Sequence, residues 1–440
     1  MSEAEVPPTV KPKRRWYQYS LRSLLFVMLL ASLGMSWVAT QRGKARRQRE
    51  AVEAILKHDG AVYYDYQLDA AGEPVPTASR PVATCWRRQL GDDFFDRVVW
   101  VNVSSDAALE PLEQLPDLQT LQLGCSDEVT DAGMVHVRGL SKLRKLWFGS
   151  TRVTDAGLAN LRSLHHLESL EIDDFNGTDA ALEHIQGLTE LRELTLCHRQ
   201  MTDRGLAYLK DLTRLRELSL YGEKITDAGL RNLKELRQLQ KLVLSGTNVT
   251  DAGMQYLEGM VELRSLDLDC TKLTDAGLVY LKGLMQLDTL SLGGCNITNA
   301  GLKNLKDLRH LRNLELTGTN VTDGGMQYLE GLLELRSLDL TNTRLTDAGL
   351  EHVRRFSRLD FLHLRGTRVT TAGAARLADM PQIRSLVLGD NDVTDADLKY
   401  LTRLTQLRSL NLESCTRLTD AAVQKLRQAL PACTIQWTPL

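Results

Sequence analysis

The sequence predicts an α/β fold, a solenoid of stacked strand-and-helix units with a parallel sheet on one side. The first observation is a 24-residue pattern that recurs without a slip from Leu143 to Leu407. The second is a change of apolar spacing inside one unit, 263–286. Its first leucines fit a strand with one buried face, and its later leucines recur at helical spacing. Because a lone unit cannot bury its apolar face, the copies must stack.

Each unit carries a helix-start signal between strand and helix, as in Thr274-Asp275-Ala276-Gly277. The Thr hydroxyl can accept from free N–H groups of the first helical turn, and the Asp charge suits the positive helix end. The ninth unit position holds a small polar residue that can satisfy backbone groups as the chain leaves the sheet. These residues are Thr151, Thr247, Thr271, Thr319, Thr343, Thr367, Cys295 and Cys415, and the departures are Phe175, Arg199 and Glu223.

This pattern resembles the leucine-rich repeat, LxxLxLxx(N/C/T)xL, most closely its ribonuclease-inhibitor-like and cysteine-containing types. The resemblance covers residues 97–440. It implies a right-handed leucine-rich repeat solenoid, or horseshoe, with a parallel inner sheet and outer helices. Val98, Val101 and Val103 fit the strand of a truncated first unit, and residues 433–437 fit a closing strand.

The N-terminal region predicts a membrane anchor. Residues 1–20 form a basic tail that we expect to be disordered, and residues 21–41 form a predicted transmembrane helix because 23–41 are uncharged. A cleaved signal peptide is the alternative, although no A-x-A site follows. Basic residues flank both ends equally, so the positive-inside rule is tied. The dense N-tail charge favours an extracytoplasmic repeat domain, whereas the unpaired cysteines favour a reducing side.

Residues 42–96 do not repeat, and we expect them to form a helix-and-strand cap over the open end of the first unit. Residues 45–57 predict a helix continuing from the membrane, 61–67 a strand, 69–82 a loop and 83–95 a second helix. Taken together, the anchor, this segment and the TDAGL-type units resemble membrane-anchored bacterial leucine-rich repeat proteins.

Composition and spacing indicate binding more than catalysis. The net charge of −2 predicts no general attraction to nucleic acid. The seven cysteines show no CxxC spacing. Five lie at or just after strand ends and are expected to be buried structural thiols, namely Cys125, Cys197, Cys270, Cys295 and Cys415. Cys85 and Cys433 lie near opposite ends of the array, too far apart to pair. No nucleophile, base and orienting acid converge, so we expect no catalytic residues, no metal and no cofactor.

The concave face of the predicted sheet is the candidate binding surface. Aromatic and His residues there are the expected anchors because such side chains dominate interface hot spots. Two acidic groups could bind a cation, although salt bridges to nearby Arg and Lys are favoured. The candidate residues are Trp147, Glu171, Asp173, Tyr221, Asp267, Asp269, Phe361 and His363. Arginines at position two of eight units could form a phosphate-binding ladder, but adjacent acids favour charge pairing.

The sequence therefore predicts a single-pass, membrane-anchored, non-enzymatic protein whose concave face binds an unidentified protein partner. One alternative is a substrate-recognition adaptor similar to F-box leucine-rich repeat proteins, which would need a helical docking domain within residues 42–96. Another is a hydrolase, which would need paired carboxylates on adjacent strands.

Overall fold

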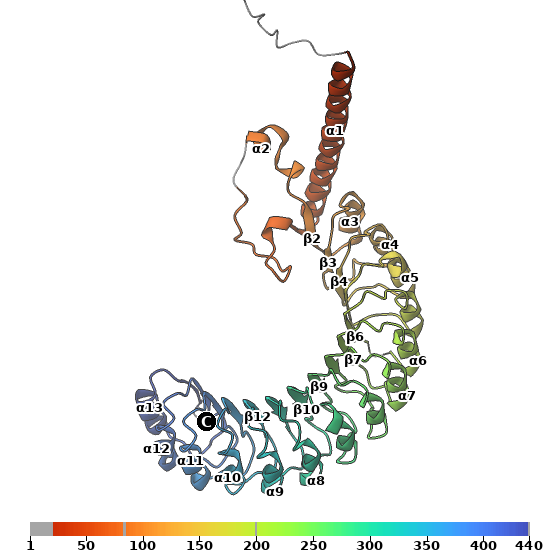
Figure 1. Cartoon of the computed structure of the whole chain (residues 1–440). Coiled ribbons are helices and arrows are strands. Elements are labelled where there is room, and N and C mark those ends of the chain that lie inside the picture. Colours follow the sequence, from red (N-terminus) through yellow and green to blue (C-terminus); the bar gives the residue numbers. More distant parts are fainter. Residues whose placement is uncertain (1–20, 82–84, 199, 439–440) are drawn as a thin grey trace, which may run out of the picture.

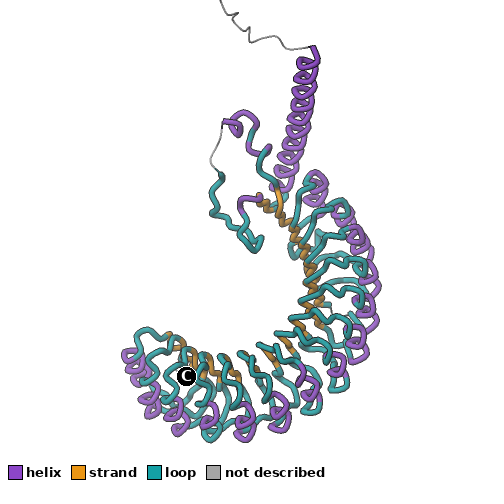
Figure 2. The backbone as a smooth tube through the Cα atoms, in the orientation of Figure 1, coloured by secondary structure: helices purple, strands orange, loops and turns teal. Residues whose placement is uncertain are grey.

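The chain forms a horseshoe around one continuous sheet of 16 strands in sequential order (Figure 1). The computed structural model describes residues 21–81, 85–198 and 200–438, so the expected tail 1–20 and the position-nine residue Arg199 lie outside the described residues. Strands line the inner side and short helices the outer side (Figure 2). The predicted α/β solenoid is therefore confirmed.

The parallel strands follow the 24-residue period. They are β2 (Val98–Val103), β3 (Thr120–Leu123), β4 (Lys145–Gly149), β5 (Ser169–Asp173), β6 (Glu193–Cys197), β7 (Glu217–Tyr221), β8 (Lys241–Val243), β9 (Ser265–Asp267), β10 (Thr289–Ser291), β11 (Asn313–Glu315), β12 (Ser337–Asp339), β13 (Phe361–His363), β14 (Ser385–Val387), β15 (Ser409–Asn411) and β16 (Thr434–Gln436). Both the truncated first strand and the closing strand are present. Leucines at unit positions one, four and six are buried in one core that runs the length of the array.

The outer helices are shorter and tighter than predicted. The α-helical pieces are α3 (Asp106–Leu109), α4 (Asp131–Met134), α5 (Asp155–Leu158), α6 (Asp203–Leu206), α7 (Asp227–Leu230), α8 (Asn299–Leu302), α9 (Asp323–Met326), α10 (Leu350–Val353), α11 (Thr371–Leu377), α12 (Asp395–Leu401) and α13 (Asp420–Ala429). The 3-10 pieces are η3 (Glu110–Gln114), η4 (Val135–Val137), η5 (Ala159–Ser163), η6 (Asp179–His184), η7 (Ala207–Leu209), η8 (Arg231–Leu233), η9 (Gly253–Leu257), η10 (Gly277–Gly283), η11 (Lys303–Leu305) and η12 (Gln327–Leu329).

The apolar spacing favours the 3-10 form but does not decide it, because Leu398, Leu401 and Leu404 also recur every three residues in the unit of α12, which is α-helical. Leu278, Leu281 and Leu284 recur every three residues, which matches the three-residue turn of a 3-10 helix better than the 3.6-residue α turn. In the last unit Val423, Leu426 and Leu430 follow a three-then-four spacing, and α13 is a ten-residue α-helix. The sequence predicted a helix in each unit but not which kind.

The Thr-Asp-Ala-Gly corner also joins neighbouring units. As predicted, the Thr hydroxyl caps its own helix in several units, such as Thr226 accepting from the Ala228 N–H. In addition, the carboxylate of Asp251 accepts from the backbone N–H of Thr274 at 2.8 Å and from its hydroxyl at 2.5 Å, one unit further on. The glycine is required here because a Cβ at Gly277 would lie 2.6 Å from that carboxylate oxygen.

The N-terminal segment closes the open end of the solenoid. Helix α1 (Leu21–Lys57) is continuous, and its last turns bury Ala51 and Ile55 against the first unit. Strand β1 (Ala61–Tyr64) pairs antiparallel with β2 and so covers the sheet edge. Short helices η1 (Asp65–Gln67), α2 (Cys85–Leu90) and η2 (Asp92–Phe94) complete it. The predicted strand 61–67 and helix 83–95 are thus each shorter than expected.

Candidate functional site: the concave face

All eight predicted site residues lie on the strands of the inner sheet or just after them. The strand register places Trp147 beside Glu171 on β4 and β5, and Cys197 beside Tyr221 on β6 and β7. Phe361 and Tyr221 are exposed, with 46% and 36% of their surfaces accessible. The sheet separates these residues into an N-terminal concave zone, comprising Trp147, Glu171, Asp173 and Tyr221, and a second group further along the arc.

The second group, Asp267, Asp269, Phe361 and His363, lies around an acidic zone, which we define as Asp267, Asp269, Glu315 and Asp339. Strand pairing aligns Asp267 with Ser291, Ser291 with Glu315, and Glu315 with Asp339 along one row of the sheet. Asp269 lies two residues after Asp267, and its backbone N–H donates to the Asp267 carboxylate at 2.9 Å. The candidate set from the sequence omitted Glu315 and Asp339. Both stand at position five of their units, but that row alone does not show which of its residues lie close to Asp269.

Gly293 leaves space between two of these carboxylates. A Cβ at this position would lie 3.1 Å from Asp269 Oδ1 and 3.4 Å from Glu315 Oε1, so any side chain would fill the gap. The Gly293 N–H donates to Asp269 Oδ1 at 2.5 Å. Burial, followed by the charges of Glu315 and Asp267, raises the pKa of Asp269 to about 6. The pKa of Glu315 is raised too, first by burial and then by Asp339.

His363 neutralises one end of the acidic zone. Its Nδ1 lies 2.9 Å from Asp339 Oδ2, and the Thr341 N–H donates to the other oxygen of that carboxylate at 2.8 Å. The hydrogen bond to Asp339 raises the pKa of His363. Burial alone would raise the pKa of Asp339, but the bonds from His363 and Thr341 outweigh it and the pKa is lowered. The three remaining carboxylates have no cationic partner among the ion pairs of the described residues.

The N-terminal concave zone borders a hollow beneath the cap. A space of about 550 Å³ is lined by Trp100, Trp147, Glu171 and Glu73, among others. The loop before β2 reaches this face, because Lys145 Nζ lies 3.3 Å from the Ala71 carbonyl oxygen and 3.4 Å from Glu73 Oε1. The cap therefore closes the end of the array and also shapes one side of the binding surface.

The arginine row is mostly paired, as the charge-pairing interpretation predicted. Arg144 and Arg192 both approach Glu168, at 2.6 and 3.8 Å. Arg312 pairs with Asp288 at 3.2 Å, and Arg336 and Arg384 both approach Asp360. Within the described chain, Arg216, Arg264 and Arg408 make no ion pair. These three arginines lie in non-adjacent units, so they do not form a continuous phosphate-binding row.

The cysteine prediction holds only in part. Cys295 and Cys415, at position nine, are buried, but Cys125 and Cys270 are exposed. Cys270 occupies position eight, where the backbone turns with φ of +55° and the side chain points outward. The expectation of buried thiols is wrong for these two, because the strand end and the turn residue were treated as equivalent. Among the residues that the structure describes, no three His, Cys, Asp or Glu side chains are arranged to hold a metal.

Comparison with known proteins supports the repeat assignment. The family described as leucine-rich repeat region matches residues 102–299, and a second leucine-rich repeat family matches 307–329 and 335–352. No curated protein matches the chain. An internalin from Listeria monocytogenes is 22% identical with a TM-score of 0.51, covering 77% of this chain and 85% of its own. A leucine-rich repeat protein from Leptospira interrogans is 18% identical with a TM-score of 0.51, covering 74% and 91%. These two structures share the fold.

Proposed function

Because the chain belongs to the leucine-rich repeat family, we propose that it is a non-enzymatic protein-binding scaffold, held at a membrane by α1. Repeat arrays of this kind present an extended surface for another protein. In this proposal residues 21–41 span the membrane, 42–96 cap the array, and 97–440 form the binding domain. The partner is a protein that presents Lys or Arg side chains to the acidic zone.

The observation that carries this proposal is the uncompensated charge of the acidic zone. Burial and then neighbouring carboxylates raise the pKa of both Asp269 and Glu315: the charges of Glu315 and Asp267 act on Asp269, and those of Asp339 and Asp267 act on Glu315. A Lys or Arg side chain placed in the space beside Gly293 would relieve this repulsion, and charge-assisted hydrogen bonds are stronger than neutral ones. Binding would then release a proton from Asp269, so affinity should increase as the pH rises through about 6.

Aromatic side chains supply the second part of the proposed interface. Trp147 faces the hollow beneath the cap, and Tyr221 and Phe361 are exposed on the concave side. Buried Trp and Tyr anchors commonly account for more than about 2 kcal/mol of binding free energy each. We expect Trp147→Ala or Tyr221→Ala to weaken partner binding at least about tenfold, measured by titration of the purified full chain.

The membrane part of the proposal rests on α1. Its N-terminal portion has a mean hydropathy of 1.8 over an 18-residue window, and none of that window is buried against the rest of the protein. An uncleaved anchor also explains why the same helix continues without a break into the cap. We propose that the repeats lie on the extracytoplasmic side. Carbonate extraction of membranes tests the anchor, and labelling a Cys introduced at exposed Glu258, in intact cells against lysate, tests the side.

A sharp test of the acidic zone uses charge-neutral variants of the full chain. Quantitative affinity capture compares wild type, Asp269→Asn/Glu315→Gln, and the matched control Glu258→Gln/Glu262→Gln on the outer side. We expect the concave pair to reduce recovery of a specific partner at least about tenfold and the control to leave it unchanged. Equal recovery with all three proteins would refute the acidic zone as the binding surface.

The adaptor alternative has less support. The described part of residues 42–96 consists of the end of α1, strand β1 and short helices of six residues or fewer. A helical docking bundle for an enzyme complex would need several longer helices that pack on one another. This segment instead packs on the first unit and the concave rim.

A further inference from the structure

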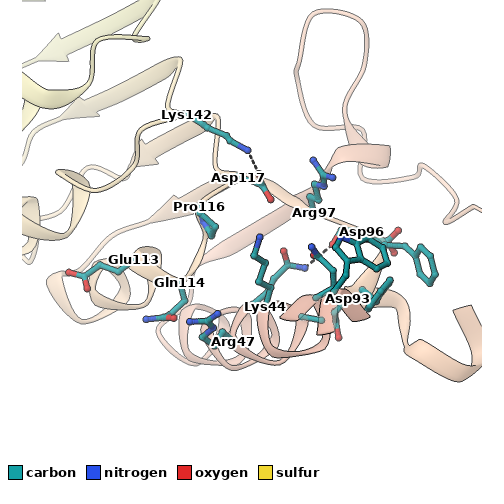
Figure 3. Close-up of a pocket in the computed structure, with 16 residues that line it drawn as sticks. Lys44, Arg47, Asp93, Asp96, Arg97, Glu113, Gln114, Pro116, Asp117 and Lys142 are labelled. Atoms are coloured by element: carbon teal, nitrogen blue, oxygen red, sulfur yellow. Dashed lines mark hydrogen bonds and ion pairs between the residues drawn. The ribbon is translucent and has the colours of Figure 1, made fainter. Parts of the chain in front are cut away.

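A hollow lies where α1 meets the first repeats, on the outer side of the cap and away from the concave face. It has a volume of about 610 Å³ and is lined by α1, by the segment around η2, and by the turns that precede β3 and β4. Residues Trp37, Gln41, Lys44 and Gln48 recur at helical spacing and line it from α1. Figure 3 shows Lys44 extending from α1 in the direction of Asp117 and Arg97.

The acidic residues of this pocket are already paired. Asp93 Oδ2 lies 2.6 Å from Arg49, and Asp96 Oδ1 lies 2.7 Å from Arg87. Glu113 lies 2.7 Å from His136, and Asp117 contacts Lys142. Asp93, Asp96 and Asp117 are therefore each paired with an Arg or Lys side chain, and Glu113 is paired with a histidine.

Three cations of the same pocket have no acidic partner. Lys44 and Arg97 are exposed and make no ion pair within the described chain, and the Nε of Arg47 donates only to the Gly43 carbonyl oxygen, at 3.4 Å. Three basic side chains without an ion pair in the described chain thus line the pocket, and three of its four carboxylates are already paired with other Arg or Lys side chains. Such a site attracts an anion, and Lys and Arg side chains are the usual ligands of phosphate.

The height of these cations along α1 matches a lipid headgroup layer. The uncharged stretch ends at Gln41, and a helix rises about 1.5 Å per residue, so Lys44 lies about 4–5 Å and Arg47 about 9 Å beyond it. Headgroups occupy about 5–8 Å on each side of the hydrocarbon core. The Lys44 backbone therefore lies near the phosphates if residues 23–41 fill the core, and Arg47 lies just beyond that layer, which is within reach of its long side chain.

Aromatic rings line the membrane-facing side of the pocket. Trp37 meets Phe94 edge to face with ring centres 6.0 Å apart, and Phe94 meets Phe95 at 5.0 Å. Trp37 is 58% exposed and Phe95 is 36% exposed. Trp in particular concentrates at the boundary between hydrocarbon and headgroups. At this depth the basic part of the pocket could bind a phosphate, and its aromatic rim could pack against the glycerol and first acyl carbons of the same lipid.

We propose that this juxtamembrane pocket binds the headgroup of an anionic phospholipid. Lys44, Arg47 and Arg97 contact the phosphate, and Trp37 with Phe95 packs against the lipid backbone. The bound lipid fixes the angle between α1 and the repeat array, because its phosphate bridges the helix and the start of β2. This proposal rests on the membrane anchor proposed above.

The test measures lipid retention by the full chain in a neutral detergent. Native mass spectrometry counts bound lipids during titration with phosphatidylglycerol, with zwitterionic phosphatidylcholine, or with inorganic phosphate alone. We expect one phosphatidylglycerol per chain to bind at least about tenfold tighter than phosphatidylcholine. Lys44→Gln/Arg97→Gln should abolish that preference. The matched control Arg42→Gln/Arg46→Gln removes two charges from the same helix outside the pocket and should keep it.

Each other outcome overturns the proposal in a distinct way. Equal loss in the control pair would indicate general surface charge, and phosphate competing as well as the lipid would indicate a free-anion site. Lys44→Glu alone, at an exposed helical position, replaces the double variant if the latter fails to fold. The anchor is tested separately: a wild-type chain that stays in solution without detergent refutes the anchor, whereas a detergent-dependent chain without lipid preference refutes only the pocket.

Discussion

The repeats of β5–β7 and those of β8–β15 carry the same leucine pattern but leave the sheet in different ways. Strands β5, β6 and β7 are five residues long, whereas β8 and the later repeat strands are three. Among the units of β5–β7, Asp174 has a φ of +42° at position eight and Gly222 a φ of +155°. From Gly246 onward, every unit turns at position eight with φ between +54° and +69°, at Gly246, Cys270, Gly294, Gly318, Asn342, Gly366, Asp390 and Ser414. Gly, Asn and Asp, which tolerate this left-handed conformation best, occupy six of these eight positions.

The left-handed turn lets the next side chain fold back into the core. The buried hydroxyl of Thr319 donates to the Leu316 carbonyl oxygen at 2.7 Å, and Thr247, Thr271, Thr343 and Thr367 repeat the bond in their own units. In the unit of β5, Phe175 also follows a residue with positive φ, and an aromatic contact takes the place of the hydroxyl bond. Phe175 meets Phe148 at 6.3 Å and His198 at 5.4 Å, both edge to face. One region thus uses hydrogen bonds at the strand exit, and the other uses packing.

The largest expected effect comes from removing the aromatic packing at the strand exit. Phe148→Ala removes a fully buried ring against which Phe175 packs, and Phe→Ala in a core costs about 3–5 kcal/mol. The midpoint of urea unfolding should fall, and hydrogen exchange should accelerate first in β4–β6. Phe361→Ala, at an exposed concave position, serves as the control and should change stability by less than about 0.5 kcal/mol. Uniform acceleration along the array would contradict a local role.

The next effect concerns two neighbouring C-terminal units that lack the bond from an Asp carboxylate to the Thr of the following unit. We call the series of such bonds the Asp-to-Thr ladder, and the contact between these two units the joint. Position 371 is Thr instead of Asp, and the following unit carries Asp397 where most other units have Gly. The carboxylate of Asp397, fully buried, accepts from the Thr394 N–H at 2.7 Å and from its hydroxyl at 2.9 Å. Asp397→Gly should therefore cost about 1–3 kcal/mol by leaving that N–H unpaired.

The same joint offers a rescue. Thr371→Asp alone would place a second carboxylate beside Asp397 and should also destabilise the protein. The double variant Thr371→Asp/Asp397→Gly recreates the ladder seen at Asp251 and Thr274 and should recover most of the wild-type stability, measured as a double-mutant cycle. Additive losses would show that Asp397 has a different role.

A smaller effect is expected from removing a threonine hydroxyl bond at the strand exit. Thr319→Val keeps the shape of the side chain but leaves the Leu316 carbonyl oxygen without its hydroxyl donor, at a cost of about 1–2 kcal/mol. Unfolding midpoints of this variant and of Thr213→Val, which replaces an exposed threonine, provide the comparison. A loss equal to that of the control would mean that the hydroxyl bond contributes nothing.

The sequence predicted the elements within each repeat but not the side-chain contacts that join one repeat to the next. The leucine period predicted the strand positions and the closing strand, because every unit carries the apolar pattern that marks its buried face. The link from Asp251 to Thr274 was not predicted, since a capping motif explains the same residues within one unit. Likewise, the concave position of Asp269 was predicted, but its proximity to Glu315 depends on Gly293 in the unit between. The eight site residues share a face as predicted, and their role in binding stays a prediction.

The smallest expected effect is electrostatic and distinguishes the acidic zone from the N-terminal concave zone. The pKa of Asp269 rises from 3.8 to about 6 on folding, so its ionisation opposes folding increasingly as the pH rises between these values. Asp269→Asn keeps an oxygen to accept from the Gly293 N–H and should stabilise the protein at pH 7.5 by about 0.5–1 kcal/mol, after allowance for solvent screening. The gain should be smaller at pH 4.5. Glu171→Gln, whose row neighbours Trp147 and Thr195 carry no charge, should give no gain in parallel denaturation curves. A pH-independent gain at Asp269 would mean that packing, and not carboxylate repulsion, limits stability there.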